Sequence, residues 1–453
     1  MFQLPKKVLK KQTIPLAWSL ICVTNFVYLY IFHSYIYGKS RHCDANFKKD
    51  LKRNFEERHP EDDNTVDRYQ NTNTSSVSLF LHSKWSEVPC NMSEYLKILR
   101  DECKTQKHKQ NKKNCNVEYL YNDCDGLRKS YLYGKEGTTF EEKIFPLAYA
   151  LKIHKDSNQA HRLLRYIYQE HNVYCIHVDK KALNEIYMFF KGIEKCFDNI
   201  FVVDNPVTVI YSSIRQVEAE LKCMEILNTL KTKWKYYINL TGQEFMLKTN
   251  LEIVKILKLL NNTNNIESET IPNGQKEKII WKRIIVGNQL KQTSVKNGRF
   301  PEDVGIRKGS AYGMFTKAFV QYILHDPFVK ELLLWFQNTF SPEEFIWATL
   351  QKLPNSPGGC ARTECTKFIS REVVWRHTPN RTTQCYGKFV RYICIFGLKD
   401  VPRLLTNENI VANKFYESYQ PLALDCIEQG MYERLLNGGH LSFDLNEYKK
   451  LLE

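Results

Sequence analysis

The central part of the chain alternates between continuous apolar runs of strand length and segments whose apolar residues recur at helical spacing. The apolar runs span 145–153, 173–178, 200–203 and 236–240. Helical spacing follows the first three runs, with apolar faces around 160–167, 186–193 and 217–224. Repeated strand–helix units of roughly 25 residues predict an α/β fold with a mostly parallel sheet, right-handed crossovers and helices on both faces.

Local signals extend this pattern in both directions. Ser213 and Gln216 have the spacing of a capping box that would open the third helix. Beyond residue 259 the periodicity loosens through a polar, Asn-rich loop, and a strand near 311–315 and a helix around 329–336 are expected after it. At 453 residues the chain is long enough for one large domain or two ordinary ones.

Several polar side chains follow the ends of the predicted strands. His154 and Asp179 come just after the first two strands, and the turn Gly242-Gln243-Glu244 follows the fourth. In open parallel sheets, ligands bind beyond the C-terminal strand ends, so these positions are candidates for a ligand site. On pattern alone each is more often structural than functional.

The N-terminal region predicts a membrane anchor. Residues 14–37 are almost free of charge and long enough to cross a bilayer as a helix, and four lysines lie just before them. The positive-inside rule then predicts a cytoplasmic tail at 1–13, a transmembrane signal-anchor at 14–37, a polar stem at 38–88 and a luminal domain at 89–453. A cleaved signal peptide is the alternative, but the apolar run is longer than usual and no small-x-small cleavage site follows.

Composition and charge narrow the class of protein. With 43% hydrophobic and 13% aromatic residues the chain is globular. Its formal charge of +15 suits an anionic partner, and the absence of a recognisable nucleic-acid module favours an anionic small ligand over nucleic acid. Fourteen cysteines in a luminal chain indicate a disulfide framework rather than a zinc cluster, because no paired CxxC units are present.

Glycosylation sequons fit the same secretory compartment. They stand at Asn73, Asn91, Asn261 and Asn380. A further sequon at Asn239 falls in a predicted buried strand, so we expect it to be unused. A cysteine-rich segment from Cys90 to Glu142 is interpreted as a disulfide-stapled lead-in to the catalytic domain.

The stretch Ser341–Leu350 carries the strongest candidate chemistry. Ser341 is expected as the N-cap of a helix with Pro342 at its first position, and Glu343 and Glu344 occupy the first turn, where carboxylates suit the helix dipole. A first-turn carboxylate is usually only a cap. The sequence of this stretch is specific, however, because it resembles the Ser-Pro-Asp-Glu-x-x-Trp-Ala-Thr motif of the core 2 and I-branching β-1,6-N-acetylglucosaminyltransferases.

The resemblance runs from about Cys90 to Cys426. Short matches occur in the same order as in the family, at 145–149, 174–179, 234–236, 309–312 and 412–415. The family is Golgi-resident, is anchored as a type II membrane protein and has a Rossmann-like fold of the GT-A kind. It transfers N-acetylglucosamine from UDP-N-acetylglucosamine to a 6-hydroxyl of a sugar on an O-glycosylated protein. Such a protein and a UDP-sugar are the partners that the resemblance implies.

The resemblance also implies a disulfide pattern. It pairs Cys90 with Cys426, Cys124 with Cys196, Cys175 with Cys223, and Cys385 with Cys394. Closeness in sequence alone suggests two further pairs, Cys103 with Cys115 and Cys360 with Cys365.

The expected chemistry is an inverting displacement. An α-linked nucleotide sugar that yields a β-linked product needs one base to take the acceptor proton, and by resemblance that base is Glu344. The diphosphate leaving group needs either a metal or fixed cations. The Asp-x-Asp at Asp123-Cys124-Asp125 precedes the first strand, which is the wrong place for a donor-site metal. No metal cofactor is therefore expected, and the resemblance assigns the diphosphate to Arg391 and Lys414.

The remaining site residues also follow from the resemblance. His154, Asp179 and Tyr211 are expected to bind the donor, and Glu267, Lys276 and Trp375 the acceptor. The acceptor match is weaker, because Ile279 or Ile280 falls near an expected arginine and His377 stands where a tyrosine is usual. Thr241, Glu244 and Met246 replace a cysteine, an aspartate and a proline of the family.

Two alternatives stay open. The first is a related transferase that uses another UDP-sugar, such as UDP-glucose or UDP-xylose, or another acceptor. The second is a non-catalytic luminal glycan-binding protein, although a binder would not need a base. A homodimer is kept as a further hypothesis.

Overall fold

The computed structural model of the chain describes residues 124–131, 133, 138–301, 305–360, 365–376, 384–436 and 443–452. Two units are present, 1–131 and 132–453, and α6 (Cys124–Tyr131) is the described part of the first. The predicted tail, membrane span and stem lie outside the described residues, as do Asn73, Asn91, Asn380 and His377. Among the described helices, none combines the length and apolar character needed to cross a bilayer.

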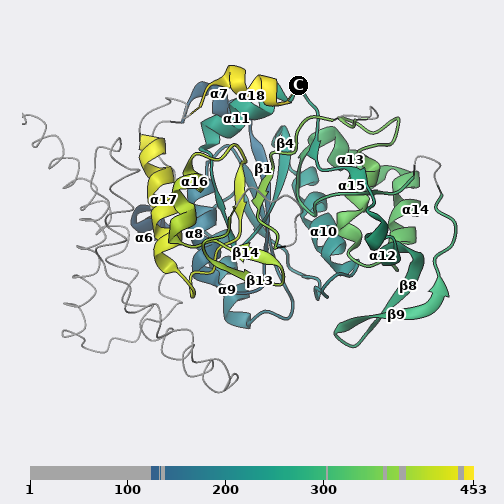
Figure 1. Cartoon of the computed structure of the whole chain (residues 1–453). Helices are drawn as coiled ribbons and strands as arrows, with labels where there is room; N and C mark the ends of the chain where they lie inside the picture. The colour runs from purple at the N-terminus through teal and green to yellow at the C-terminus, as the bar shows by residue number, and fades with distance from the viewer. Residues whose placement is uncertain are drawn as a thin grey trace, which may run out of the picture. The chain divides into compact units, whose positions relative to one another are not determined.

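A six-stranded sheet forms the centre of the second unit (Figure 1), with strand order β3-β2-β1-β4-β11-β6. Its strands are β1 (Leu147–Ile153), β2 (Val173–Val178), β3 (Ile200–Val202), β4 (Tyr236–Thr241), β6 (Asn265–Ile266) and β11 (Gly313–Thr316). The strands β1 to β4 pair in parallel, and β11 is antiparallel to both of its neighbours. The predicted α/β fold with a mostly parallel sheet is therefore confirmed.

The apolar runs form these strands because both faces of the sheet are covered. On one face α10 (Arg215–Thr229) packs on β1 and β2, and Ala148 and Ala150 share a core cluster with Met224. On the other face lies α8 (Ser157–Ile167), where a Cβ added at Gly242 would come within 3.0 Å of the Ala160 Cβ. Helices on both faces are visible in Figure 1.

Smaller elements surround this sheet. The remaining strands are β5 (Glu244–Met246), β7 (Glu269–Thr270), β8 (Trp281–Val286), β9 (Gln289–Lys296), β10 (Arg307–Lys308), β12 (Arg371–Val373), β13 (Lys388–Val390), β14 (Ile393–Ile395) and β15 (Val411–Asn413). The remaining helices up to the motif are α7 (Phe140–Lys143), α9 (Asn184–Glu194), α11 (Asn250–Leu259), η3 (Asn273–Gln275), α12 (Glu277–Ile280), α13 (Lys317–His325) and α14 (Pro327–Phe336). From the motif onward they are η4 (Pro342–Glu344), α15 (Ile346–Leu350), η5 (Leu398–Asp400), α16 (Val401–Leu405), α17 (Pro421–Leu436) and α18 (Leu445–Leu452).

The start of α10 differs from its prediction. The N-cap is Ile214, and the Ser213 hydroxyl accepts the Arg215 N–H at 3.2 Å without the reciprocal bond from Gln216, so the capping box of Ser213 and Gln216 is wrong. The Ser213 hydroxyl instead donates to the Ile210 carbonyl, and the Gln216 amide donates to Glu343, 127 residues away. A tertiary contact has taken the side chain that the local pattern assigned to the helix end.

Three disulfides are present as expected, Cys175–Cys223, Cys360–Cys365 and Cys385–Cys394. Cys124 and Cys196 are each disulfide-bonded, while Cys90, Cys103 and Cys115 lie outside the described residues. Cys426 is a free, buried thiol, which contradicts its predicted bond to Cys90. Every other described cysteine is already bonded, so no described thiol remains for it, and burial raises the pKa of Cys426 to about 12.

The two described sequons differ in accessibility. Asn261 is exposed at the end of α11, where an oligosaccharide would meet solvent. Asn239 is fully buried in β4, and its side chain accepts the Gly313 N–H at 3.0 Å and donates to the Ala311 carbonyl at 3.0 Å. The folded chain therefore has no room for a glycan at Asn239, which fits the expectation that this sequon is unused.

Candidate active site

The motif at Ser341–Leu350 folds as two short helices rather than one capped helix. Ser341 adopts a left-handed conformation with φ of 52° and makes no side-chain cap. Its N–H donates to the Ser212 carbonyl at 2.8 Å, and the 3-10 turn η4 then leads into α15. The predicted N-cap is wrong because the backbone of Ser341 is held by the segment before α10. Buried Phe345 and Trp347 fix the motif against the core.

Glu344 is the more accessible of the two adjacent carboxylates. Its side chain is 24% exposed, and its Oε2 lies 3.0 Å from Lys278 Nζ and 3.6 Å from Lys308 Nζ. Two cations beside one carboxylate orient it and balance its charge. Sequence reasoning identified neither lysine. For Lys308 the nearby match at 309–312 was the available signal.

Glu343 lies in a different environment although it is the next residue. It is buried, its Oε1 accepts from Gln216 Nε2 at 2.9 Å, and its Oε2 has no partner. Burial raises the pKa of Glu343 to about 8, with the neighbouring Glu344 charge acting in the same direction. Near neutral pH the protonated form of Glu343 is therefore favoured, whereas the Glu344 side chain is partly exposed and contacts two lysines.

Not all of the residues predicted to bind the acceptor lie beside Glu344. Glu267 belongs to the same region as Glu344. Burial, Glu269 and Glu344 raise the pKa of Glu267, and Lys308 lowers it. Gly309 joins the two segments: its N–H donates to the Glu344 carbonyl at 2.7 Å, and a Cβ there would lie 1.9 Å from the Glu267 carbonyl oxygen. Only glycine fits such an approach.

Lys276 and Trp375 occupy the margins. Lys276 is exposed just before α12, and it is Lys278, two residues later, that contacts Glu344. Trp375 is 46% exposed and bridges to Ile393 of β14. The structure therefore places Glu267 beside the candidate base and offers Lys278 where the sequence suggested Lys276.

The predicted diphosphate cations come from two segments that the fold brings together. Arg391 stands in the two-residue turn between β13 and β14, where Arg391 and Tyr392 both have positive φ, at 48° and 68°. Two left-handed residues are typical of a type I′ hairpin and cost more for side chains than for glycine. Lys414 follows β15, and its pKa is lowered by burial, by Lys155 and by Arg391. Arg391 also lies over the Tyr211 ring, at 5.4 Å from its centroid.

The other donor candidates lie close to these cations. His154 follows β1, and its pKa is lowered by burial, Lys155 and Lys414 and raised by Asp156 and Asp179. Asp179 follows β2 and its Oδ1 accepts the Val209 N–H at 3.2 Å. His154, Asp179, Tyr211, Arg391 and Lys414 are thus brought together at the C-terminal end of the parallel strands, as the strand-end rule predicts.

Sequence reasoning missed two members of this cluster, Lys155 and Tyr416. Lys155 lies over the Tyr416 ring at 4.4 Å from its centroid, and Lys414 lies over the same ring at 5.1 Å. The position of Lys155 directly after His154 was the available signal. Together these contacts form an aromatic-backed basic surface suited to an anionic ligand.

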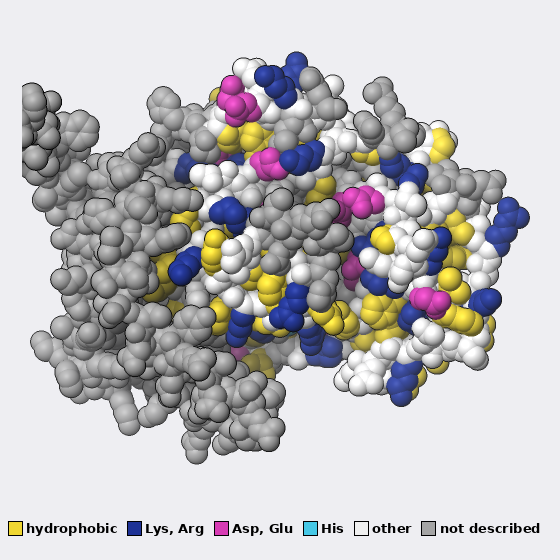
Figure 2. Space-filling view, in the orientation of Figure 1, with side chains coloured by type: hydrophobic (Ala, Val, Ile, Leu, Met, Phe, Trp, Pro, Cys, Tyr) yellow, Lys and Arg dark blue, Asp and Glu magenta, His cyan; other side chains and the backbone are white. Residues whose placement is uncertain are grey.

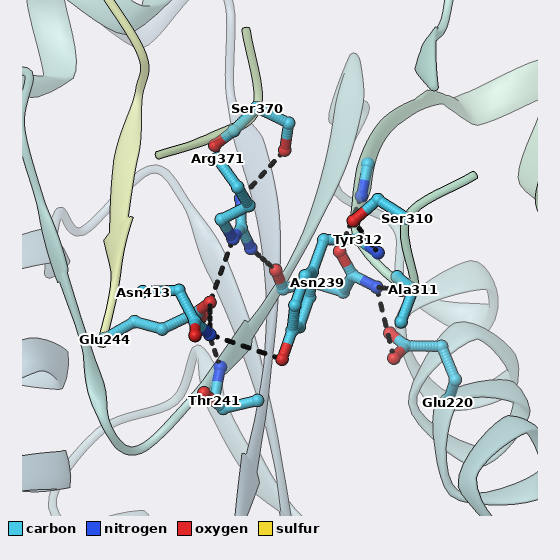
Figure 3. Close-up of polar contacts among 11 residues, drawn as sticks. Glu220, Asn239, Thr241, Glu244, Ser310, Ala311, Tyr312, Ser370, Arg371 and Asn413 are labelled. Atoms are coloured by element: carbon cyan, nitrogen blue, oxygen red, sulfur yellow. Dashed lines mark hydrogen bonds and ion pairs between the residues drawn. The ribbon is translucent and has the colours of Figure 1, made fainter. Parts of the chain in front are cut away.

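A buried polar network supports the floor of the site (Figure 3). Glu244 accepts from Arg371 Nε at 3.0 Å, from Asn413 Nδ2 at 2.8 Å and from the Thr241 N–H at 2.7 Å. Arg371 also donates to the Asn239 carbonyl. Because the side chains of Glu244 and Arg371 are fully buried and paired, Glu244 serves as a structural anion in this fold.

Tyr312 connects the two halves of the site. Its hydroxyl lies 3.3 Å from Asn413 Nδ2, next to Lys414, and the Arg371 guanidinium lies over its ring at 4.9 Å. Burial raises the pKa of Tyr312, and both Glu244 and Glu343 act on it in the same direction. Tyr312 is thus close to Asn413, which precedes Lys414, and within electrostatic range of Glu343 of the motif.

The Asp-x-Asp sequence at 123–125 stays an untested position for a metal site. Asp123 lies outside the described residues, and Asp125 is exposed in α6 of the first unit. Within the described ranges no three His, Cys, Asp or Glu side chains are grouped closely enough to hold a metal ion.

Comparison with known proteins gives a consistent set of relatives. Residues 147–405 match the family model described as "Core-2/I-Branching enzyme". The chain is 34% identical over 330 residues to the human "Beta-1,3-galactosyl-O-glycosyl-glycoprotein beta-1,6-N-acetylglucosaminyltransferase", covering 70% of this chain and 77% of that protein. It is 32% identical over 385 residues to the protein of the same name from Bos taurus, covering 80% of this chain and 89% of that one.

Proposed function

The chain belongs to the Core-2/I-Branching enzyme family, and we propose that it transfers N-acetylglucosamine from UDP-N-acetylglucosamine to a 6-hydroxyl of an O-glycan core. The expected product is a core 2-type β-1,6 branch on Galβ1-3GalNAc. The observation that carries this proposal is the position of Glu344 in the family motif, where its carboxylate is paired with Lys278 and Lys308.

The proposed reaction is a single inverting displacement. Glu344 takes the proton of the acceptor 6-hydroxyl as that oxygen bonds to C1 of the sugar. The bond from C1 to the diphosphate oxygen breaks, and its electron pair leaves with UDP. Arg391 and Lys414 stabilise the charge that develops on the diphosphate, which is the task that a metal performs in other transferases. We therefore expect no metal requirement.

The surrounding residues have proposed binding roles. His154, Asp179 and Tyr211 contact the donor at the strand ends of a GT-A-type Rossmann-like fold. Glu267 and Trp375 contact the acceptor, with Lys278 the better-placed cation than Lys276 because it reaches Glu344. These roles rest on the grouping of the residues around Glu344 and Lys414.

The activity is tested directly with the full-length chain in detergent and a panel of UDP-sugars, with Galβ1-3GalNAc as acceptor. The product mass identifies the sugar, and the proton spectrum of the new linkage identifies the position. Transfer of N-acetylglucosamine to O6 is expected. Exclusive use of UDP-glucose or UDP-xylose would favour the related-transferase alternative, and glycan binding without any transfer would favour the glycan-binding protein.

We further propose a Golgi enzyme of type II topology, with the tail at 1–13, the anchor at 14–37 and the stem at 38–88. The support is the lysine cluster before the apolar run. Asn91 should then be glycosylated in cells, which a mobility shift on enzymatic deglycosylation detects when compared with Asn91→Gln. An unmodified Asn91 together with a luminal N-terminus would overturn the orientation. The homodimer hypothesis is tested by sedimentation of the detergent-solubilised chain.

A further inference from the structure

The β8–β9 hairpin exposes aliphatic side chains that the core does not use. Within the described residues its two strands pair only with each other, and they extend beyond the neighbouring helices (Figure 1). Ile284 is 50% exposed and Val286 45%. Apolar and basic side chains both reach the surface over this hairpin (Figure 2). A two-stranded ribbon is marginally stable in water by itself, so exposed aliphatic residues at its tip point to a second role.

The base of the hairpin is attached to the acceptor side of the site. The Arg283 N–H donates to the Asn338 carbonyl at 2.7 Å, and Arg283 Nη1 donates to the Lys278 carbonyl at 2.7 Å. Where β9 ends, also at the base, the Asn297 N–H donates to the Ile280 carbonyl at 2.8 Å. Lys278 is the residue that contacts Glu344, so the hairpin extends outward from the candidate base.

The tip of the hairpin faces α10 across a groove of about 610 Å³. Ile285, Gly287 and Asn288 form one wall, and the segment 206–210 and the exposed side of α10 form the other. This volume lies within the range of roughly 300–1,000 Å³ that ligand sites occupy. The groove adjoins the donor candidates, since Lys180 follows Asp179 and Ile210 precedes Tyr211, but none of the residues given a role in the proposed reaction lines it.

The charges around the groove favour an anionic occupant. The hairpin residues 281–296 include four basic side chains and no acidic one. Three basic and two acidic side chains line the groove, Lys180, Arg215, Lys222, Glu218 and Glu225. Arg215 pairs with Glu218 at 2.6 Å, whereas Lys180 and Lys222 have no ion-pair partner among the described residues, which leaves one positive charge in excess. The unpaired strand edges add backbone donors and acceptors of the kind that bind an extended peptide.

We propose that this groove binds the polypeptide that flanks the glycan of an O-glycosylated acceptor, with a preference for an extended acidic segment. The inference rests on the proposed transfer to an O-glycan, since it concerns the protein part of that substrate. With a rise of about 3.3 Å per residue, β8 places its tip roughly 17 Å from its base. An extended peptide of about five residues covers that distance, so the glycan can occupy the catalytic centre while its flank lies in the groove.

The test compares two acceptors on the full-length chain in detergent, free Galβ1-3GalNAc and a glycopeptide that carries it with acidic flanks. Ile285→Ser is expected to lower kcat/KM for the glycopeptide by about fivefold, as expected from lost apolar burial, and to leave the free disaccharide unchanged. Val295→Ser is the matched control, since Val295 is 54% exposed on the same hairpin but does not line the groove.

A charge variant tests the preference for acidic flanks. Lys222→Glu should lower kcat/KM for the acidic glycopeptide by about tenfold at low salt and have no such effect on a glycopeptide with basic flanks. Lys231→Glu, just beyond α10 and outside the groove, is the control for net charge. The difference between the acidic and basic glycopeptides should shrink as salt is raised.

Three outcomes would overturn the groove proposal. Equal losses on the disaccharide and the glycopeptide would mean that Ile285 supports the catalytic centre, and no loss on either would mean that the groove does not bind the flank. If Ile285→Ser weakened binding to phosphatidylserine vesicles while glycopeptide kinetics stayed unchanged, the surface would contact lipid. In each case transfer by the wild-type chain to the free disaccharide would still support the proposed activity, so the two failures are distinguishable.

Discussion

On the donor side of the candidate site Arg391 and Lys414 have no ion-pair partner within the described ranges, whereas on the acceptor side Glu344 contacts Lys278 at 3.0 Å and Lys308 at 3.6 Å. Burial is the main cause of the lowered pKa of Lys414, and repulsion from Lys155 and Arg391 adds to it. A diphosphate would relieve that repulsion on binding. The acceptor side is already balanced, which suits a carboxylate that takes and releases a proton. The proposed diphosphate cations are therefore unpaired within the described ranges, whereas Glu344 already has two cationic partners.

The largest expected effect tests the acceptor half. Glu344→Gln should fold and bind UDP as the wild type does, yet lose transfer by about a thousandfold or more, because only the proton acceptor is removed. Transfer is measured by product formation, and UDP binding by calorimetry serves as the control. Substantial remaining activity would assign the base to another residue, with Glu343 the next candidate.

The donor half is tested by its two cations. Arg391→Ala or Lys414→Ala should weaken UDP binding and slow transfer by about a hundredfold, since each removes a charge that stabilises the leaving group. Added manganese should not restore the rate, and EDTA should not affect the wild type. Arg391→Lys should recover part of the loss, because lysine keeps the charge without the planar fork of arginine. A wild-type chain that EDTA inactivates and manganese restores would refute the metal-independent mechanism.

Glu343 provides a pH test of the acceptor half. Its pKa is raised from 4.5 to about 8, so the folded state holds a proton that the unfolded state releases. The free energy of unfolding should therefore fall as pH rises from about 4.5 to about 8. Glu343→Gln, which stays neutral, should lack this component, and its stability relative to the wild type should rise by about 5 kcal/mol across that window. Urea unfolding at several pH values measures the difference. Parallel pH profiles of the two proteins would show that Glu343 is ionised in the fold.

The smallest effect distinguishes two lysines of the acceptor half. Lys278→Ala should lower kcat/KM by about tenfold because it removes a partly exposed partner of Glu344, and the screening of such pairs limits the loss. Lys276→Ala is the matched control, as Lys276 is exposed two residues earlier, and it should change the rate by about twofold or less. A larger loss at Lys276 than at Lys278 would restore the sequence-based assignment.

Much of the fold followed from local patterns. The strands β1, β2 and β4 correspond closely to the apolar runs, because a strand covered on both faces needs apolar residues throughout. The ends of elements were less predictable. Gln216 looked like part of a capping box but binds Glu343, and Ser341 looked like an N-cap but is left-handed. In both cases the competing partner comes from a distant segment, which a local pattern does not contain.

Some residues of the candidate site were likewise predictable from the sequence, and others were not. Motif positions brought His154, Asp179, Arg391, Lys414 and Glu344 to attention, and the fold places the first four in one basic cluster. Lys155 and Lys308 were missed because lone lysines are usually solvated surface. Lys276 was assigned by the resemblance, in a segment where the match to the family is weak, and Lys278 was not considered. Cys426 was assigned to a bond that the structure does not contain.

The sequence by itself determined the first strand–helix units, the family motif around Glu344 and the strand-end positions proposed as a ligand site, since each depends on neighbouring residues. Only the tertiary structure decided that Lys278 contacts Glu344 from 66 residues away and that Gln216 contacts Glu343 from 127 residues away. The same holds for the different surroundings of Glu343, which is buried beside Gln216, and Glu344, which is partly exposed beside two lysines. Burial and charge pairing depend on what surrounds a side chain in space, and adjacent residues in one motif can therefore be given opposite environments.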